Sequence, residues 1–437
     1  MDKKLYEAYI KILEEELVPA MGCTEPIAIA YGAALARETL GSLPQKVIIS
    51  ASGNIIKNVK SVVVPNTGGL RGIPAAAAAG VVAGKAEKKL EVLADITSKE
   101  VEEISAYLKA AAFEVKTVES SCVFDIIVEL QGEGHQCSVR IQGHHTNVVY
   151  VEKDGEVLLD KDYAEGQEGE RTDRSLLSVE EIIRFADQVE ISHVEKVIQR
   201  QIDYNTAIAQ EGLSGKWGAG IGKILLLSYG NSVHNRAKAM AAAGSDARMN
   251  GCDMPVVINS GSGNQGMTAS LPVIVYGEDM KVSRETLIRA LVVSNLVTIH
   301  LKSGIGTLSA YCGAISAGCG AGAGITYLYG GRFKEIAHTI VNALAINSGV
   351  VCDGAKASCA AKIASAVEAG TLGMKMYQFG SEFYGGDGIV ASGIEETIEN
   401  VSQLARDGMR ETDKKIIDIM IRNQGKEKQK EDPLHIL

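Results

Sequence analysis

The chain carries the run TLSAYCGAISAGC at residues 307–319 and the run NSGVVCDGAKASC at residues 347–359. Together they contain four of the eight cysteines, set among Gly, Ala and Ser. Residues 303–331, which include the first run, contain no Asp, Glu, Lys or Arg. A stretch this long could cross a bilayer, but its many glycines and serines suit a helix packed inside a protein. We therefore expect a buried core helix here and no membrane span.

The cysteines of these two runs are candidate metal ligands. Cys312, Cys352 and Cys359 are separated by 40 and 7 residues, which matches neither the compact ferredoxin run nor a zinc pair of pairs. Thiolates are preferred ligands of iron–sulfur clusters, and three of them on a four-iron cluster leave one iron open to a substrate atom. Ordinary buried cysteines are also common in protein cores. Spacing alone leaves both interpretations open.

The composition is that of a soluble globular protein with two or three domains. Of 437 residues, 46% are apolar and 22% charged, and the net charge of −10 argues against a broad nucleic-acid or anionic-membrane surface. With one Trp, six Phe and 47 Gly, the core must consist of small and aliphatic side chains on closely packed helices. The first residues lack the apolar segment of a secretory signal, so we expect a cytoplasmic protein with reduced thiols.

The hydrophobic patterns predict an α+β fold with three parts. Residues 1–42 form N-terminal helices that pack on the helical domain, residues 43–178 form a smaller α+β domain, and residues 179–437 form the mainly helical domain. Expected strands are 46–50, 61–64, 124–129, 136–141 and 148–152, followed by a hairpin and a linker up to 178. Expected helices are 4–17, 24–40, 98–112, 179–188, 191–209, 232–243, 284–302, 333–346, 360–369 and 395–409.

Near the N-terminus, the sequence Gly22-Cys-Thr-Glu-Pro26 has the features of a helix start. Thr24 is a natural N-cap and Pro26 suits the first turn. Cys23 would then lie at the positive end of the helix dipole, which favours a lowered thiol pKa and a role as base or nucleophile. A small buried cysteine at a turn is the alternative.

Two further segments carry polar groups suited to a small ligand. Residues 64–72, with Asn66 and Thr67, combine turn-forming glycines with hydrogen-bond donors that could hold a carboxylate, although a plain surface turn has the same composition. Adjacent His144 and His145 lie between two expected strands, and we expect them to face opposite sides of the sheet rather than one metal.

Two glycine motifs resemble nucleotide-binding loops only in part. Residues 217–224 lack both the first Gly and the final Ser or Thr of a phosphate loop. Residues 261–266 satisfy G-x-G-x-x-G, but Pro272 follows closely and no strand with an acidic residue comes after it, which argues against a dinucleotide fold. Ser260, Ser262 and Asn264 instead suit a nest for an amino-acid carboxylate. A capped polar turn between helices is the alternative.

Taken in order, the motifs at 22–26, 64–68 and 261–266 and the cysteines at 312, 352 and 359 together resemble the L-serine dehydratase alpha-chain family, and within it the L-cysteine desulfidases. The resemblance extends from residue 20 to about residue 410. It implies an oxygen-sensitive [4Fe-4S] cluster held by Cys312, Cys352 and Cys359. It also implies that Cys23 is the proton acceptor. It assigns no role to Cys122, Cys137, Cys252 or Cys319, although Cys319, seven residues after Cys312, could approach the cluster.

The resemblance implies β-elimination from a small amino acid, with Asn66, Thr67, Ser260, Ser262 and Asn264 as expected substrate contacts. L-cysteine would give pyruvate, ammonia and hydrogen sulfide, and L-serine is the alternative substrate because only the leaving atom differs. A non-catalytic cluster-based redox or iron sensor is a different class of hypothesis, but it would need neither Cys23 nor a polar cradle. We expect a homo-oligomer and no nucleic-acid partner.

Overall fold

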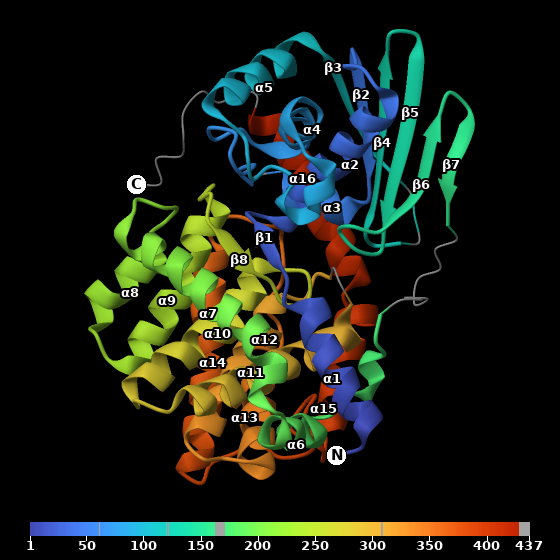
Figure 1. Ribbon diagram of the computed structural model, residues 1–437. Coiled ribbons are helices and arrows are strands. Elements are labelled where there is room, and N and C mark those ends of the chain that lie inside the picture. Colours follow the sequence, from blue (N-terminus) through green and yellow to red (C-terminus); the bar gives the residue numbers. More distant parts are fainter. Residues whose placement is uncertain (61, 119, 121, 162–170, 307–308, 428–437) are drawn as a thin grey trace.

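The computed structural model describes residues 1–60, 62–118, 120, 122–161, 171–306 and 309–427. A six-stranded sheet with its helices forms one side of the molecule, and a larger helical body forms the other (Figure 1). The α+β fold class is therefore confirmed. Among the helices in the described part of the chain, none combines the length and apolar character that a membrane span requires.

The helical body is built around α12 (Gly313–Leu328), whose residues from Ala314 to Leu328 are all buried. Helices α10, α11, α13 and α14 pack around it. Its glycines permit this, because a Cβ at Gly318 would overlap the carbonyl oxygen of Ala366 on α14. The expected buried helix is thus confirmed for these residues, while the uncharged stretch as a whole is not one helix because α11 ends at Ile305.

The remaining helices of this body follow the predicted order, and two of them, α6 and α13, have the predicted bounds. They are α6 (Val179–Gln188), α7 (Ile191–Ser214), α8 (Ile221–Tyr229), α9 (Val233–Met249), α10 (Gly263–Asp279), α11 (Arg284–Ile305), α13 (Phe333–Ile346), α14 (Cys359–Gln378), α15 (Ile394–Gln403) and α16 (Arg410–Glu427). Helices α8 and α10 were not predicted, because each begins in a glycine motif that we interpreted as a loop. A short 3-10 turn, η2 (Arg174–Leu176), precedes α6, and a π-helical turn, η3 (Leu404–Gly408), extends α15.

The sheet has the strand order β3-β2-β4-β5-β6-β7, with only β2 and β3 parallel. Helices α2 and α4 pack against its central strands, and the alternating burial of β5 matches a sheet covered on one face. The elements are α2 (Thr24–Leu40), β2 (Lys46–Ala51), α3 (Gly53–Val59), α4 (Gly72–Ala83), η1 (Ala86–Glu91), α5 (Ser98–Ala110), β3 (Ala112–Thr117), β4 (Asp125–Gly132), β5 (His135–Gln142), β6 (Val148–Lys153) and β7 (Glu156–Asp160).

Two predictions in this part are wrong, and one falls largely outside the described residues. The expected strand at 61–64 is replaced, in its described part, by an isolated bridge between Val63 and Arg71, flanked by α3 and α4. Helix α4 is buried on nearly every side, so its sequence lacks the one-sided apolar pattern that identifies a surface helix. The hairpin of β6 and β7 is confirmed, whereas most of the predicted linker, at 162–170, and the polar tail from 428 lie outside the described residues.

The two N-terminal helices separate, contrary to the expectation that both pack on the helical domain. Helix α1 (Lys3–Glu16) packs on α7 and α11, but α2 lies in the core beneath the sheet. Between them, β1 (Pro19–Met21) pairs with β8 (Pro255–Val257) of the helical body, so the first turn of α2 stays beside α10. The domain boundaries at residues 43 and 178 stay a prediction.

The C-terminal helix α16 crosses from the helical body to the sheet side, where it packs on α3 (Figure 1). Its Asp413 forms a buried ion pair with Lys57 at 2.5 Å. Helix α3 in turn supports the loop before α14, because Gly354 lies so close to the Lys57 carbonyl that a Cβ would overlap it. The two sides of the molecule are therefore joined near this loop.

Candidate active site

Seven of the nine residues that the sequence singles out line one small chamber of about 110 Å³. The chamber lies where helices from both sides of the molecule begin. The seven residues are Cys23, Ser260, Ser262, Asn264, Cys312, Cys352 and Cys359.

Backbone pairing holds the three expected cluster ligands together across 47 residues of sequence. The Cys312 N–H donates to the Val350 carbonyl at 3.1 Å, and the Cys352 N–H donates to the Ala310 carbonyl at 2.6 Å. Cys359 is the first residue of α14. Two cysteines therefore lie on either side of one antiparallel bridge, and the third follows at the next helix start.

Four helices, α2, α10, α12 and α14, begin at the chamber. Their N-cap residues are Cys23, Ser262, Cys312 and Ser358, and none of these side chains makes a capping hydrogen bond. The first N–H groups of a helix carry partial positive charge and bind anions readily. Their convergence makes the chamber attractive to negative charge in a protein whose net charge is −10.

Three cationic side chains, Arg248, Lys302 and Lys362, add to this positive field. Burial lowers the pKa of Lys302 to about 8, and the nearby Cys352 and Cys312 thiols only partly oppose that shift. Its ammonium donates to the Gly306 carbonyl at 2.5 Å. The chamber is thus prepared to hold thiolates, an anionic cluster or a carboxylate.

The thiols fit the donor chemistry of an iron–sulfur cluster. Cys312, Cys352 and Cys359 are all free, and burial together with its two thiol neighbours raises the pKa of Cys312 to about 12. Among the described residues, no three His, Cys, Asp or Glu side chains gather closely enough to hold a single metal ion. The fit therefore rests on three unpaired thiols around one cavity, each of which could bind a different iron.

The loop that carries Cys352 is held against α14 by a small ion-pair cluster. Asp353 contacts Lys356 and Lys362, each at 2.5 Å, and Lys362 also donates to the Val351 carbonyl at 2.8 Å. Burial alone would raise the pKa of Asp353, but the two lysines lower it to about 2. The cluster fixes Cys352 relative to Cys359.

Cys23 reaches the chamber as expected, but its protonation differs from the prediction. It is itself the N-cap of α2, in place of the expected Thr24. Burial, followed by the nearby Glu25 carboxylate, raises its pKa well above the usual value, and its thiol donates to Glu25 Oε2 at 3.1 Å. These effects outweigh the helix dipole, so the resting group is a thiol hydrogen-bonded to a carboxylate.

Asn66 and Thr67 do not line the chamber. The Asn66 amide donates to the Leu93 carbonyl at 2.8 Å, and the Thr67 hydroxyl donates to the Val64 carbonyl at 2.7 Å. Between the two motifs, Pro65 occupies the space where a Cβ on Gly22 would lie, and Gly22 has a positive φ of 54°. The loop thus supports the turn before Cys23, and its glycine-rich pattern gave no sign of that role.

Five residues of the chamber were not selected from the sequence as site residues: Glu25, Arg248, His145, Gln265 and Tyr311. His145 Nε2, Gln265 Oε1 and the Tyr311 hydroxyl are buried without a hydrogen-bond partner. Glu25 and Gln265 lie inside quoted motifs, where their position beside Cys23 and Ser262 was the available signal. Arg248 and Tyr311 lie in segments without such a motif.

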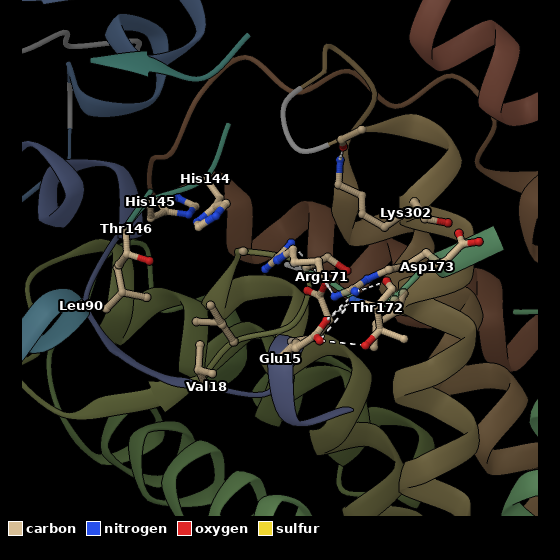
Figure 2. A pocket seen from close by; sticks show the side chains of 18 residues that line it. Glu15, Val18, Leu90, His144, His145, Thr146, Arg171, Thr172, Asp173 and Lys302 are labelled. Atoms are coloured by element: carbon tan, nitrogen blue, oxygen red, sulfur yellow. Dashed lines mark hydrogen bonds and ion pairs between the residues drawn. The ribbon is translucent and has the colours of Figure 1, made fainter. Parts of the chain in front are cut away.

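A larger cavity of about 580 Å³, which we call the vestibule, adjoins the chamber and shares His145, Ser260, Gly261 and Lys302 with it. His144 and His145 lie on one side of it, with Arg171 and Lys302 across from them (Figure 2). The expectation that the histidines face opposite sides of the sheet is wrong, because they occupy a turn between β5 and β6 and both face this cavity. Burial lowers the pKa of His144 to about 4.

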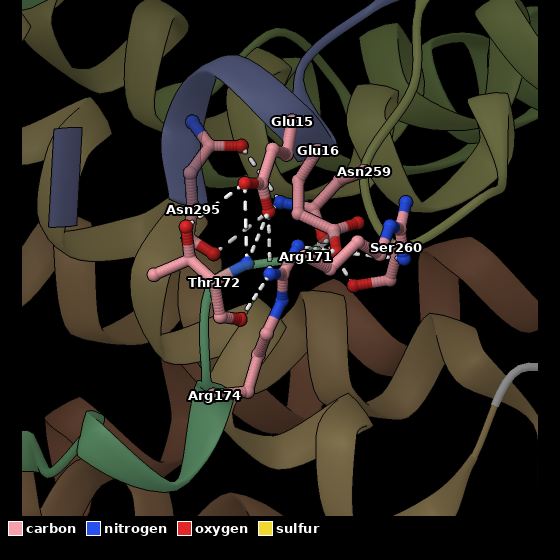
Figure 3. A network of polar contacts seen from close by, with 8 residues as sticks. All are labelled: Glu15, Glu16, Arg171, Thr172, Arg174, Asn259, Ser260 and Asn295. Atoms are coloured by element: carbon pink, nitrogen blue, oxygen red, sulfur yellow. Dashed lines mark hydrogen bonds and ion pairs between the residues drawn. The ribbon is translucent and has the colours of Figure 1, made fainter. Parts of the chain in front are cut away.

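The vestibule wall contains a network of ion pairs that ties α1 to the chain before α6 (Figure 3). Arg174 contacts Glu15 at 2.5 Å and Glu16 at 2.7 Å, and Arg171 lies 3.6 Å from Glu16. Nearby, Ser260 donates to Asn259, whose amide donates to Asn295. The network fixes the wall from which Ser260 faces the chamber.

The two glycine motifs have different fates. At the start of α8, the buried Asp246 carboxylate accepts hydrogen bonds from backbone N–H groups, including that of Gly222 at 3.3 Å. That helix start therefore binds a carboxylate of its own chain. At the start of α10 no side chain fills this position, and Ser262 and Asn264 face the chamber.

Comparison with known proteins agrees with this geometry. Residues 87–418 match the family model described as serine dehydratase alpha chain. A UPF0597 protein of Desulfitobacterium hafniense (strain Y51) is 59% identical over 96% of this chain and 97% of its own. UPF0597 proteins of Lachnoclostridium phytofermentans and Treponema denticola are 52% and 45% identical, over 95% and 97% of this chain and 100% of each relative. The chain therefore belongs to the serine dehydratase alpha-chain family.

Proposed function

We propose that this protein is an iron–sulfur-dependent lyase that catalyses β-elimination from L-cysteine to pyruvate, ammonia and hydrogen sulfide. The observation that carries the proposal is the meeting of three free thiols from two separate segments with a fourth thiol, Cys23, at one chamber. Membership in the serine dehydratase alpha-chain family supports the reaction class. L-serine is the alternative substrate.

In this proposal Cys312, Cys352 and Cys359 would hold a [4Fe-4S] cluster. Such a cluster supplies a Lewis acid at the iron that lacks a cysteine ligand, where it favours departure of a sulfur or oxygen substituent. The converging helix starts and Lys362 stabilise the negative charge of the three thiolates.

Cys23 and Glu25 would together remove the α-proton. The Cys23 thiol already donates to Glu25 Oε2, so proton transfer to the carboxylate leaves a thiolate that can accept the proton from the substrate's α-carbon. The Arg248 guanidinium stabilises this thiolate, since its charge lowers the pKa of Cys23 against the larger effect of burial. The elimination product then loses ammonia by hydrolysis to give pyruvate.

Two features favour an enzyme over a redox or iron sensor. A sensor needs the ligands but has no use for a thiol–carboxylate pair beside them. Nor does it require buried polar groups without partners, such as Gln265 Oε1 and His145 Nε2, at the same chamber. Unpartnered buried groups are costly, and an incoming substrate would satisfy them.

The proposal is tested by an anaerobic assay of protein reconstituted with iron and sulfide. We expect pyruvate and sulfide from L-cysteine in equal amounts, with slower or no pyruvate from L-serine. Faster turnover of L-serine would select the alternative substrate. A fully loaded cluster with no pyruvate from either amino acid would contradict the lyase and favour the sensor.

A further inference from the structure

Arg248 on α9 is a buried cation without an anionic partner. Its residue is 2% exposed, and its guanidinium donates to the Gly22 carbonyl at 2.8 Å and to Asn264 Oδ1 at 3.2 Å. Both acceptors are neutral, and within the described part of the chain the guanidinium has no carboxylate partner. A guanidinium has five N–H donors, so donors remain for a ligand.

Burying an unpaired charge is expensive, and proteins retain such a group where a ligand supplies the opposite charge. The surroundings of Arg248 suit an anion rather than a neutral group. Gly263, the first residue of α10, lies so close that a Cβ there would overlap Arg248 Nε. The guanidinium is thus placed directly against an uncapped helix start, beside the buried and unpartnered Gln265 Oε1.

We propose that Arg248, together with the start of α10, binds the carboxylate of a small α-amino acid. The inference rests on the proposed function, to which it adds the anchor that orients the substrate. Arg248 bonds to Gly22, the neighbour of Cys23, while Gln265 lies against Gly313, the neighbour of Cys312. A carboxylate held between these contacts places the rest of a three-carbon amino acid among the four thiols.

The test measures equilibrium binding of L-alanine, which has a carboxylate but no β-substituent to eliminate, to reconstituted protein by calorimetry. Ethylamine, which lacks the carboxylate, is the second probe. The variants are Arg248→Lys and Arg248→Met. The matched control is Arg200→Met, since Arg200 is a partly buried arginine that donates to the Leu17 carbonyl away from the chamber.

We expect Arg248→Lys to weaken L-alanine binding about tenfold and Arg248→Met on the order of a hundredfold, because a forked, charge-assisted pair is lost. Iron content, ethylamine binding and the control variant should be unchanged. If Arg248→Met does not fold, Arg248→Lys still decides, because an arginine that only supplies charge to Cys23 would be replaced by lysine without loss.

Unchanged L-alanine binding in the folded variants, or no L-alanine binding by the wild type, overturns the anchor. These outcomes are separate from failure of the proposed function. Carboxylate binding that depends on Arg248 without any turnover would uphold the anchor and reject the lyase. Turnover of L-cysteine with L-alanine binding unaffected in Arg248→Met would reject the anchor alone.

Discussion

The chamber and the vestibule are adjoining cavities that share four residues, yet their polar groups are satisfied in opposite ways. In the vestibule wall, Glu15 and Glu16 are paired with Arg171 and Arg174. In the chamber, Arg248 meets only neutral acceptors, and buried atoms of His145, Gln265 and Tyr311 have no partner. The vestibule is larger by volume, but the groups that the fold leaves unsatisfied mark the chamber as the place where a ligand binds.

The strongest break in this contrast is expected at Cys23. We expect Cys23→Ser and Glu25→Gln each to lower turnover by a factor of roughly 10² to 10⁴, because each removes one member of the proton-accepting pair. Iron content should not change, since neither residue is needed to hold the cluster. Turnover and iron are measured on the same anaerobic samples.

Cys252→Ser is the control for this prediction, because Cys252 is a buried free cysteine that does not line the chamber. Full activity in Cys23→Ser would reject the proton-acceptor role and leave the cluster hypothesis standing. Loss of iron in Cys23→Ser would instead indicate a fourth ligand.

In the vestibule wall, Arg174→Met should affect stability rather than chemistry. The Arg174 side chain is 11% exposed and its partner Glu16 is 7% exposed, so the change leaves buried carboxylates uncompensated and should cost about 3 kcal/mol in the free energy of unfolding. Arg184→Met removes an exposed pair with Glu181 and should cost below about 1 kcal/mol. Denaturant unfolding measures both, and equal losses would contradict the assignment of Arg174 as a buried clamp.

The loop beside the thiols offers a smaller effect. Asp353→Asn should release Lys356 and Lys362 and weaken retention of the cluster by about 10- to 100-fold, the range expected when a group that orients metal ligands is lost. The rate of iron loss to a chelator under anaerobic conditions measures this. An unchanged rate would show that backbone pairing alone orients Cys352.

The smallest expected effect concerns pH and His144. The pKa of His144 is lowered to about 4 in the folded protein, whereas an unfolded histidine titrates near 6.5. The stability associated with neutral His144 is therefore fully present above about pH 6.5 and is lost as the pH falls toward 4. Relative to wild type, His144→Gln should gain on the order of 1 kcal/mol in the free energy of unfolding between pH 7 and pH 5. Parallel curves for the two proteins would contradict this.

Sequence patterns predicted the elements that have a one-sided apolar face or a clear cap, such as α6 and α13. They failed for α4 and α10, which are buried on nearly every side or begin in a glycine motif. In the candidate site, the thiols were found because cysteine has distinctive chemistry, whereas Arg248 became visible only through its burial and its partners. The reversed pKa of Cys23 likewise depends on desolvation, a property of packing that local sequence does not encode.

The account depends most directly on the cluster ligands. The decisive measurement is iron and acid-labile sulfide per chain after anaerobic reconstitution of the wild type, of the Cys312→Ser, Cys352→Ser and Cys359→Ser variants, and of Cys319→Ser. Cys319 is the matched control, because it is buried seven residues after Cys312 and does not line the chamber. We predict about four iron and four sulfide in the wild type and in Cys319→Ser, the content of one [4Fe-4S] cluster, and loss of both in each of the other three variants. A wild type that retains no iron, or a full complement in all three ligand variants, would contradict the account.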